Sequence, residues 1–419
     1  MSSQTFLLGR HIKACESPPV EGGAARDDSR RPAGNLHDIS AVAPNGWKPR
    51  FKLFRESTDN LLNYENVCLY CGSRWPMTKT FPDPIRPNAG VESNRQKQTA
   101  GWRALRPLPE GPLDIVGDVH GEIDALRMLI AHLGYDEQGN HPQGRRLVFV
   151  GDLVDRGPDS PGVVRLVAQM VGSGVAFAVM GNHDLNILNG RKQGNNAWYF
   201  EHGPVKANVN RVAGEDEAQE IRAFLLSLPL ALERSDLRVV HAYWNEAVLR
   251  QFEGEPDAVG LFQRTKDRLD RELASEPDEL VRTLAHQNRN PTKLITSGPE
   301  GKARSAFFAD GKRRMNARLP WWDDYDEEPV VVFGHYWRLP HPQMRGGESL
   351  MSDYPLNSML GRGSTICVDY SVGSRFLDRE AGVPADIFHG RLAALRWPER
   401  ELVFDNGEQM PVIEPALVS

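Results

Sequence analysis

The chain has 419 residues, of which 40% are hydrophobic and 25% charged, with a formal net charge of −6. This ordinary globular composition supplies a core of more than one layer and favours two or three domains. The mildly acidic balance argues against a general nucleic-acid or membrane-surface binder. Apolar runs fall short of the ~20 residues of a membrane span, and no signal peptide is recognised. Four cysteines do not form a disulfide framework, so we expect a cytoplasmic protein.

The first hundred residues differ from the rest of the chain. Ser17–Gly46 is rich in Pro, Gly, Ala and charge and shows no periodicity, which is typical of disorder. We therefore expect a partly disordered N-terminal extension over residues 1–110. A main domain over residues 111–405 and a C-terminal tail over residues 406–419 would follow. The extension could recruit a protein partner or cover the site.

The extension also contains a C-x-x-C pair, Cys68 and Cys71. With Cys15 and His11, the pair could complete a four-ligand zinc knuckle. One C-x-x-C is not a site, however, and ordinary free thiols are the reading that we favour.

From Gly111 onward, apolar strands alternate with helices, the pattern of βαβ construction. One helix is indicated by apolar residues at helical spacing from Ile123 to Leu133, with Gly134 as its stop, and a second by Val163–Val171. The polar segment of about residues 257–318 is predicted to be a partly helical insertion or cap. Strands are predicted at Leu113–Val116, Leu147–Val150, Val175–Met180, Leu237–Val240, Val330–Phe333, Thr365–Val368, Leu392–Leu395 and Leu402–Phe404.

Several segments begin with an apolar run and end in a carboxylate, amide or imidazole. They are DIVGDVHG (Asp114–Gly121), VGDLVDRGPDS (Val150–Ser160), MGNHD (Met180–Asp184), VVHAYW (Val239–Trp244) and VVFGHYW (Val331–Trp337). In an open α/β sheet, side chains that follow the carboxyl ends of buried strands converge on one crevice. We therefore expect one shared site.

The polar residues of these segments suit a pair of divalent cations. Asp118 and His120 could chelate one ion, and Asp152 could bridge two. The candidate ligands are Asp118, His120, Asp152, Asn182, His241 and His335. This mixed set favours Mn, with Fe or Zn as alternatives, over Ca or Mg. His341 is a weaker competitor for the place of His335, while His202 and His286 are predicted to be surface or structural residues.

Three further residues complete the predicted chemistry. Arg156 can hold phosphate oxygens with its planar guanidinium. His183 could protonate the leaving oxygen, and Asp155 would orient His183 and fix its tautomer.

The motifs D-x-H-G, G-D-x-x-D-R-G, G-N-H-[DE], a later strand-end His and a final G-H resemble those of the calcineurin-like metallophosphoesterases. The D-R-G at Asp155–Gly157 resembles the phosphoprotein phosphatase branch, which includes the bacterial symmetrical diadenosine tetraphosphatases. The strings VGDLVDRGPDS and FGHYW look closer to those bacterial enzymes than to the eukaryotic serine/threonine phosphatases. The resemblance covers about Pro112–Arg375. It implies an α/β fold, a two-sheet β-sandwich flanked by helices, and the residue roles given above. The family also leads us to expect a second phosphate-binding arginine, for which Arg362 is a weak candidate.

The expected activity is hydrolysis of a phosphate ester or phosphoanhydride by direct attack of a metal-bridging hydroxide. The favoured substrate is a nucleotide such as a dinucleoside polyphosphate. A serine/threonine-type phosphoprotein phosphatase and a nucleic-acid-end phosphatase are alternatives, followed by a non-catalytic binding module. Aromatic residues near the later motifs could stack on a nucleobase, although core packing is the favoured reading. They are Trp321, Trp322, Trp337, Tyr243 and Trp244.

Overall fold

The computed structural model describes residues 101–200, 211–309, 312–340, 350–352 and 354–415. Most of the predicted N-terminal extension, including its four candidate zinc ligands, lies outside these residues, as do His202 and His341. No helix within the described ranges is long and apolar enough to cross a membrane.

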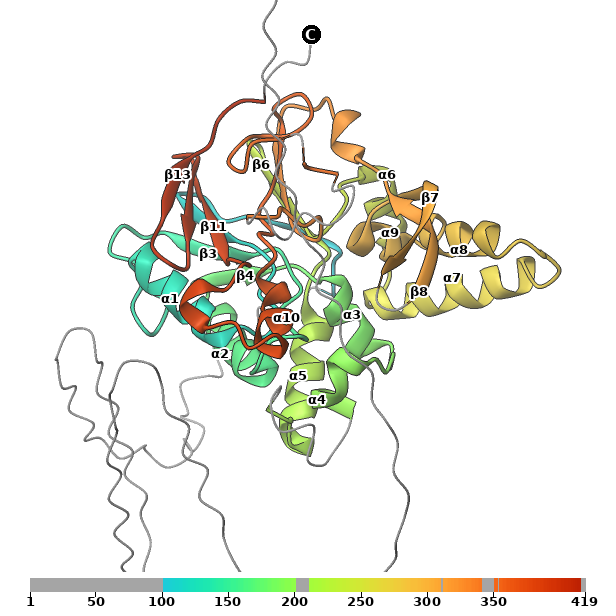
Figure 1. Ribbon diagram of the computed structural model, residues 1–419, viewed down its shortest axis with the longest axis horizontal. Helices are drawn as coiled ribbons and strands as arrows, with labels where there is room; N and C mark the ends of the chain where they lie inside the picture. Colours follow the sequence, from blue (N-terminus) through green and yellow to red (C-terminus); the bar gives the residue numbers. More distant parts are fainter. Residues whose placement is uncertain (1–100, 201–210, 310–311, 341–349, 353, 416–419) are drawn as a thin grey trace, which may run out of the picture. The chain divides into compact units, whose positions relative to one another are not determined.

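Strands from distant parts of the sequence assemble into two mixed sheets (Figure 1). The five-stranded sheet has the order β1 (Leu105–Pro107), β5 (Ala231–Arg234), β6 (Leu237–Val240), β9 (Val330–Phe333), β10 (Thr365–Cys367). The six-stranded sheet has the order β13 (Gln409–Pro411), β12 (Glu401–Phe404), β11 (Ala393–Trp397), β2 (Leu113–Val116), β3 (Arg146–Phe149), β4 (Ala176–Ala178). A separate two-stranded sheet consists of β7 (Glu300–Ala309) and β8 (Lys312–Arg318).

The helices lie mainly between the strands in the sequence. They are α1 (Ile123–Leu133), α2 (Ser160–Gly172), α3 (Asn182–Leu188), α4 (Ala197–Phe200), α5 (Glu215–Ser227), α6 (Glu246–Leu249), α7 (Ala258–Glu272), α8 (Glu279–Asn288), α9 (Pro291–Ser297) and α10 (Arg375–Glu380). The alternation of strand and helix predicted from Gly111 onward is confirmed, as is the α/β class.

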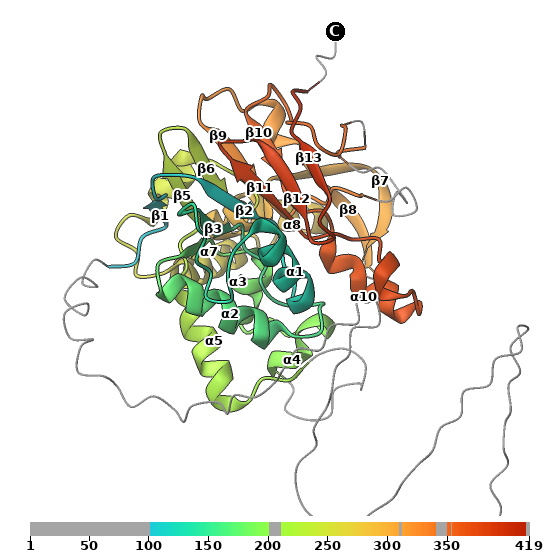
Figure 2. The same ribbon diagram turned by 90° about the vertical axis from the view of Figure 1, so that its left-hand side faces the viewer.

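Alternate side chains of the strands point to two different cores. Leu113 and Ile115 of β2 pack with Val239 of β6 and Val332 of β9, which fills the space between the two large sheets. Phe149 of β3 points the other way, toward the side chains of α1, α2 and α5. Because successive side chains of a strand face opposite sides, each large sheet can pack on both faces. The predicted two-sheet sandwich flanked by helices is therefore confirmed (Figure 2).

The first predicted helix is reproduced at both ends. Leu126, Leu129 and Leu133 recur at helical spacing and are buried on the face that packs on the six-stranded sheet. Gly134 ends the helix with φ 95°, the left-handed conformation that glycine adopts without a steric penalty.

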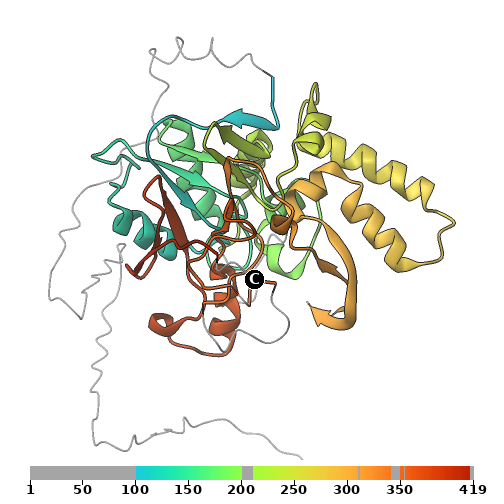
Figure 3. The ribbon, with the colours of Figure 1, turned by 90° about the horizontal axis from the view of Figure 1, so that it is seen from above.

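The segment of residues 257–318 differs in part from the expectation. It contains α7, α8 and α9, so the partly helical prediction is confirmed, but it also holds the hairpin of β7 and β8, which the sequence analysis did not predict. Helices α7 and α8 run side by side, with the hairpin next to α8 (Figure 3). Strands β1, β5 and β13 were also missed. Strand β13 lies in the segment expected to be a C-terminal tail, and it pairs with β12 of the main domain. The domain boundaries themselves stay a prediction.

Candidate active site

Both large sheets contribute the carboxyl ends of parallel strands to one place. Strands β2, β3 and β4 run parallel in one sheet, and β6, β9 and β10 run parallel in the other. The candidate ligands follow these strands in the order Asp118 and His120 after β2, Asp152 after β3, Asn182 after β4, His241 after β6 and His335 after β9. The convergence predicted from the motifs is therefore present in the fold.

The backbone at this site is strained. Seven non-glycine residues in the described ranges have positive φ, and five of them are predicted site residues. These are His120 (48°), Asp152 (48°), Asp155 (73°), Arg156 (70°) and His335 (63°). Such conformations cost of order 1–3 kcal/mol each and cluster at functional sites, where the surrounding structure enforces them. The strain marks this group independently of any sequence motif.

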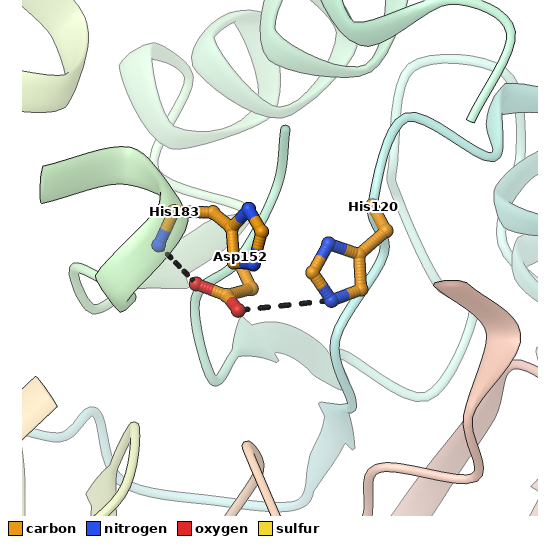
Figure 4. Close-up of side chains that lie close together, drawn as sticks. All are labelled: His120, Asp152 and His183. Carbon is orange, nitrogen blue, oxygen red and sulfur yellow. Dashed lines mark hydrogen bonds and ion pairs between the residues drawn. The ribbon is translucent and has the colours of Figure 1, made fainter. Parts of the chain in front are cut away.

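Asp152 lies at the centre of the group. Its Oδ1 accepts a hydrogen bond from the backbone N–H of His183 at 2.8 Å and lies 3.3 Å from Nε2 of His241. Its Oδ2 lies 3.7 Å from Nε2 of His120 (Figure 4). A Cβ at Gly181 would lie 2.2 Å from Asp152 Oδ1, so the G-N-H-D motif requires glycine for this close approach.

Asp118 joins the two sheets at the site. The backbone N–H of His335 lies 3.2 Å from both of its carboxylate oxygens, and Nε2 of His120 lies 3.8 Å from Oδ2. A Cβ at Gly334 would lie only 2.0 Å from Asp118 Oδ1. The side-chain Nε2 of His335 is buried and has no hydrogen-bond partner among the described residues. This nitrogen therefore has a lone pair or proton with nothing to satisfy it.

The rings of two histidines are oriented by hydrogen bonds between Nδ1 and a backbone carbonyl oxygen. Nδ1 of His241 contacts the carbonyl oxygen of Val150 at 2.8 Å, and Nδ1 of His120 contacts that of Val154 at 3.1 Å. A carbonyl oxygen can only accept, so each Nδ1 carries the proton in this arrangement. Nε2 of each ring is then directed toward the carboxylates, and that of His241 also lies 3.1 Å from Oδ1 of Asn182. Metal-binding histidines commonly have this kind of support.

The electrostatics of the group attract positive charge. Burial, followed by repulsion from Asp369, raises the pKa of Asp118 well above its usual value. Burial also opposes ionisation of Asp152, but the surrounding histidines, His241 first, outweigh it and hold its pKa well below the usual value. Burial disfavours the charged form of His241, yet the carboxylates of Asp152 and Asp118 raise its pKa to about 9. A bound cation would favour the ionised form of these buried carboxylates.

Two sets of side chains are close enough to hold metal ions. His120, Asp152 and His183 form one set, and Asp152, His241 and His335 form the other, with the ligand atoms of each set within 4.8 Å of one another. Asp152 belongs to both sets, as a bridging carboxylate would. Carboxylate and imidazole donors, together with the unpaired Nε2 of His335, fit divalent cations that accept nitrogen and oxygen ligands.

Beside the carboxylates lies the predicted acid and its partners. Nδ1 of His183 contacts Asp155 Oδ2 at 2.7 Å, and the other oxygen of Asp155 accepts from Nε1 of the buried Trp198 at 2.8 Å. Nη2 of Arg156 lies 3.4 Å from Nε2 of His183. The structure therefore brings together Asp155, Arg156 and His183 as the sequence analysis expected, while their roles stay a prediction.

Sequence reasoning missed two residues near the carboxylates. Asp369 follows β10 and is buried, its Oδ2 has no partner among the described residues, and burial raises its pKa. The signal was present, because an apolar strand followed by an acid is the pattern of the other segments. Arg318, at the end of β8, donates to the carbonyl oxygen of His335 at 2.7 Å. No sequence signal marked Arg318, because it lies in the polar insertion.

The weak candidate for a second phosphate-binding arginine is not at the site. Arg362 lies in an exposed turn that precedes β10, at the amino end of the strand, whereas the site residues follow carboxyl ends.

The aromatic residues divide into two groups. Trp321, Trp322 and Trp244 are buried, and Tyr243 packs against Trp321 with ring centroids 5.4 Å apart. Core packing, the favoured reading, is therefore correct for these four. Trp337 is different, because 43% of it is exposed.

Comparison with known proteins places the fold and the site in a family. Residues 111–357 match the family model described as calcineurin-like phosphoesterase, and this chain belongs to that family.

Similar proteins include bis(5′-nucleosyl)-tetraphosphatases. The asymmetrical enzyme PrpE of Halalkalibacterium halodurans is 56% identical over 119 residues, 26% of this chain and 46% of the relative. The symmetrical enzyme of Methylococcus capsulatus is 28% identical over 246 residues, 53% of this chain and 80% of the relative. A solved protein serine/threonine phosphatase from Saccharomyces cerevisiae is 15% identical over 78% of this chain and 90% of its own, with a TM-score of 0.41. The chain spans about half the length of the asymmetrical enzymes it matches first.

Proposed function

We propose that the protein is a hydrolase of phosphate esters or phosphoanhydrides that works with two divalent cations. The observation that carries this proposal is the position of Asp152 between His120 on one side and His241 and His335 on the other. The His183–Asp155 pair and Arg156 lie beside this group. Asp118, His120, Asp152, Asn182, His241 and His335 would hold the cations. When bound, the cations would activate the attacking water and neutralise phosphate charge.

The remaining steps belong to side chains of this chain. The guanidinium of Arg156 would hold the phosphate oxygens in a fixed orientation through charge-assisted hydrogen bonds. Asp155 accepts the Nδ1 proton of His183, so the second proton of the protonated imidazolium would be carried on Nε2, which would donate it to the leaving oxygen and leave a neutral ring. Trp198 holds Asp155 in place, which keeps the imidazole oriented during the transfer.

For the substrate, we propose a dinucleoside polyphosphate such as diadenosine tetraphosphate. Two kinds of relative, the symmetrical and the asymmetrical tetraphosphatases, carry that activity in their names. A phosphopeptide and a 5′-phosphorylated oligonucleotide represent the other two substrate classes that the motifs allow. All three substrates should be compared at equal concentration with the same metal.

The first test is hydrolysis of p-nitrophenyl phosphate and of its bis-ester by metal-stripped protein that is resupplied with Mn, Fe, Zn or Mg. We expect turnover to return with metal and to be lost in Asp152→Asn and His183→Asn. The matched controls are Asp124→Asn and His132→Asn, which change the same residue types at exposed positions of α1 and should keep full activity.

Two outcomes would contradict the two-cation hydrolase, and a third would contradict the proposed substrate. Wild-type activity in Asp152→Asn would show that the shared carboxylate is not needed. Metal-independent turnover would exclude the two-cation mechanism. A preference for a phosphopeptide over diadenosine tetraphosphate would replace the nucleotide substrate by a phosphoprotein while leaving the hydrolase in place.

A further inference from the structure

Trp337 is unusual among the aromatic residues next to the site. Its neighbour Tyr336 is 2% exposed and Trp322 is not exposed, whereas Trp337 is 43% exposed. Tryptophan is a large apolar side chain that normally buries most of its surface, and exposed rings of this kind are enriched where a ligand or partner binds. The sequence places this ring two residues after His335, a predicted ligand.

The ring lies against the residue proposed to hold phosphate. The Cζ atom of Arg156 is 5.1 Å from the centroid of the Trp337 ring, a cation–π distance. The same guanidinium lies 3.4 Å from Nε2 of His183. Arg156 thus connects the exposed ring to the group proposed to protonate the leaving oxygen, and a phosphate held by Arg156 would lie beside Trp337.

This contact has a consequence for binding. A guanidinium packed against an indole restricts the ring before any ligand arrives, so less side-chain entropy is lost when a second planar group stacks on it. Every nucleobase offers such a planar face, and stacking on an aromatic side chain does not depend on which base is present. The chemistry beside the phosphate position therefore suits a nucleoside phosphate better than a simple phosphate ester.

We propose that Trp337 forms a stacking subsite for the base of a nucleoside phosphate, with Arg156 holding both the phosphate and the back of the ring. The subsite rests on the proposed function, because it places the phosphate at Arg156. The subsite determines which substrates bind. The cations and His183 would serve any phosphate substrate, whereas Trp337 selects substrates that carry a base.

A second role for the ring must be separated from this one. Trp337 could act only by positioning Arg156, in which case its loss would weaken every phosphate ligand alike. AMP and ribose 5-phosphate distinguish the two roles, because they share the phosphate and the sugar and differ only in the base. Their affinities for full-length, manganese-loaded protein can be measured by isothermal titration calorimetry with the phosphonate analogues of both ligands, whose P–C bond the proposed hydrolase does not cleave.

The wild-type protein should bind AMP roughly 10- to 100-fold more tightly than ribose 5-phosphate, which corresponds to ~1–3 kcal/mol of stacking. Trp337→Ala should abolish this difference and leave the affinity for ribose 5-phosphate within about twofold. Trp337→Phe should keep most of the difference because it retains an aromatic face. The matched control is Met128→Ala, because Met128 is also an exposed apolar residue but lies on α1. This variant should alter neither affinity.

Two results would overturn the subsite. One is an equal loss of affinity for both ligands in Trp337→Ala, which would assign the ring to positioning Arg156. The other is unchanged AMP binding in that variant. Because these measurements do not depend on turnover, a protein that binds AMP through Trp337 but hydrolyses nothing would refute the proposed function and keep the subsite. A hydrolase whose AMP affinity ignores Trp337 would do the reverse.

Discussion

Asp114 lies in β2 and Asp118 in the loop that follows it. Both carboxylates are buried, but their hydrogen-bond partners differ. Asp114 of β2 accepts from the hydroxyl of Tyr135 at 2.6 Å and from Nε and Nη2 of Arg145 at 2.9 and 2.8 Å. Asp118, four residues later, is just as buried, but its hydrogen bonds come from the backbone N–H of His335. Asp114 accepts hydrogen bonds from a cationic side chain, whereas among the described residues Asp118 accepts them only from the backbone.

This difference separates a structural charge from a functional one. Burying a charge costs free energy unless the charge is paired. Asp114 and Arg145 pair with each other, so this carboxylate does not require a bound cation. Asp118 lies near Asp152 and Asp369 instead, and a cation from solution would stabilise the ionised form of these acidic groups. Burial alone therefore does not identify a functional carboxylate, and the identity of its partner does.

The largest expected effects come from changing each of the two carboxylates to its amide. Asp118→Asn should lower turnover by more than about 100-fold, because changes around metal ligands alone cost 10- to 100-fold. Its stability should be unchanged or higher, since a neutral amide replaces a carboxyl group whose ionisation is opposed by burial and by Asp369. Asp114→Asn should lose ~3–5 kcal/mol of stability, because it leaves Arg145 buried without its anionic partner, and should keep its turnover below its melting temperature. Urea unfolding and initial rates on the same samples measure both, and equal behaviour of the two variants would contradict the comparison.

Removing the cation of the structural pair should have the next largest effect. Arg145→Met leaves Asp114 without its positive partner, and breaking a buried ion pair in this way costs ~3–5 kcal/mol. Its specific activity at low temperature should match that of the wild type, because Arg145 does not contact the site. Combining Arg145→Met with Asp114→Asn should recover part of the loss if the pair is the cause. Additive losses would show that the two residues act separately.

Metal binding should stabilise the folded protein only when the carboxylates of the candidate site, such as Asp118, are intact. An ion present at about 100 times its Kd stabilises the folded state by ~2.7 kcal/mol, which raises Tm by several degrees. We expect this rise when Mn is added to metal-stripped wild-type protein, a much smaller rise in Asp118→Asn, and the full rise in the exposed control Asp124→Asn. Differential scanning calorimetry provides the readout, and an equal rise in Asp118→Asn would argue against metal binding at this cluster.

The smallest effect concerns Glu399, which lies on the solvent-exposed side of the Asp114–Arg145 ion pair. Glu399 accepts from Arg145 at 2.8 Å but is about half exposed. Burial opposes its ionisation, but the hydrogen bond from Arg145 outweighs this and lowers its pKa below 4.5. Its contribution is therefore present above pH 4.5 and lost as the pH falls through the lowered pKa. Glu399→Gln should cost at most ~1 kcal/mol at pH 7, as for surface ion pairs, and nothing in strong acid. A pH-independent loss in urea unfolding would contradict this account.

Much of the fold could be predicted because the local pattern and the global structure agree. The segments that became β2, β6 and β9 were predicted with the same bounds as observed, since each is a short apolar run followed by a polar loop. The predicted site residues meet because the parallel strands bring their carboxyl ends to one edge, a rule that needs no knowledge of the final packing.

The missed features depend on long-range contacts. Arg318 reaches His335 from a hairpin whose strands pair only with each other and carry no apolar alternation. Arg145 was not recognised as the partner of Asp114, because the two residues are 31 positions apart and meet only once β2 and β3 pair. The exposure of Trp337 and the burial of Trp321 are likewise decided by tertiary packing, which the local sequence around each residue does not reveal.

The left-handed backbone at His120, Asp152, Asp155, Arg156 and His335 has a consequence for how such a protein could be improved. Glycine adopts these angles without strain, so replacing one of the five residues by glycine would relieve local backbone strain while removing a side chain of the site. A directed-evolution screen that rewards heat resistance alone would therefore tend to select against the chemistry of the site. Only a screen that also demands turnover would retain these five side chains.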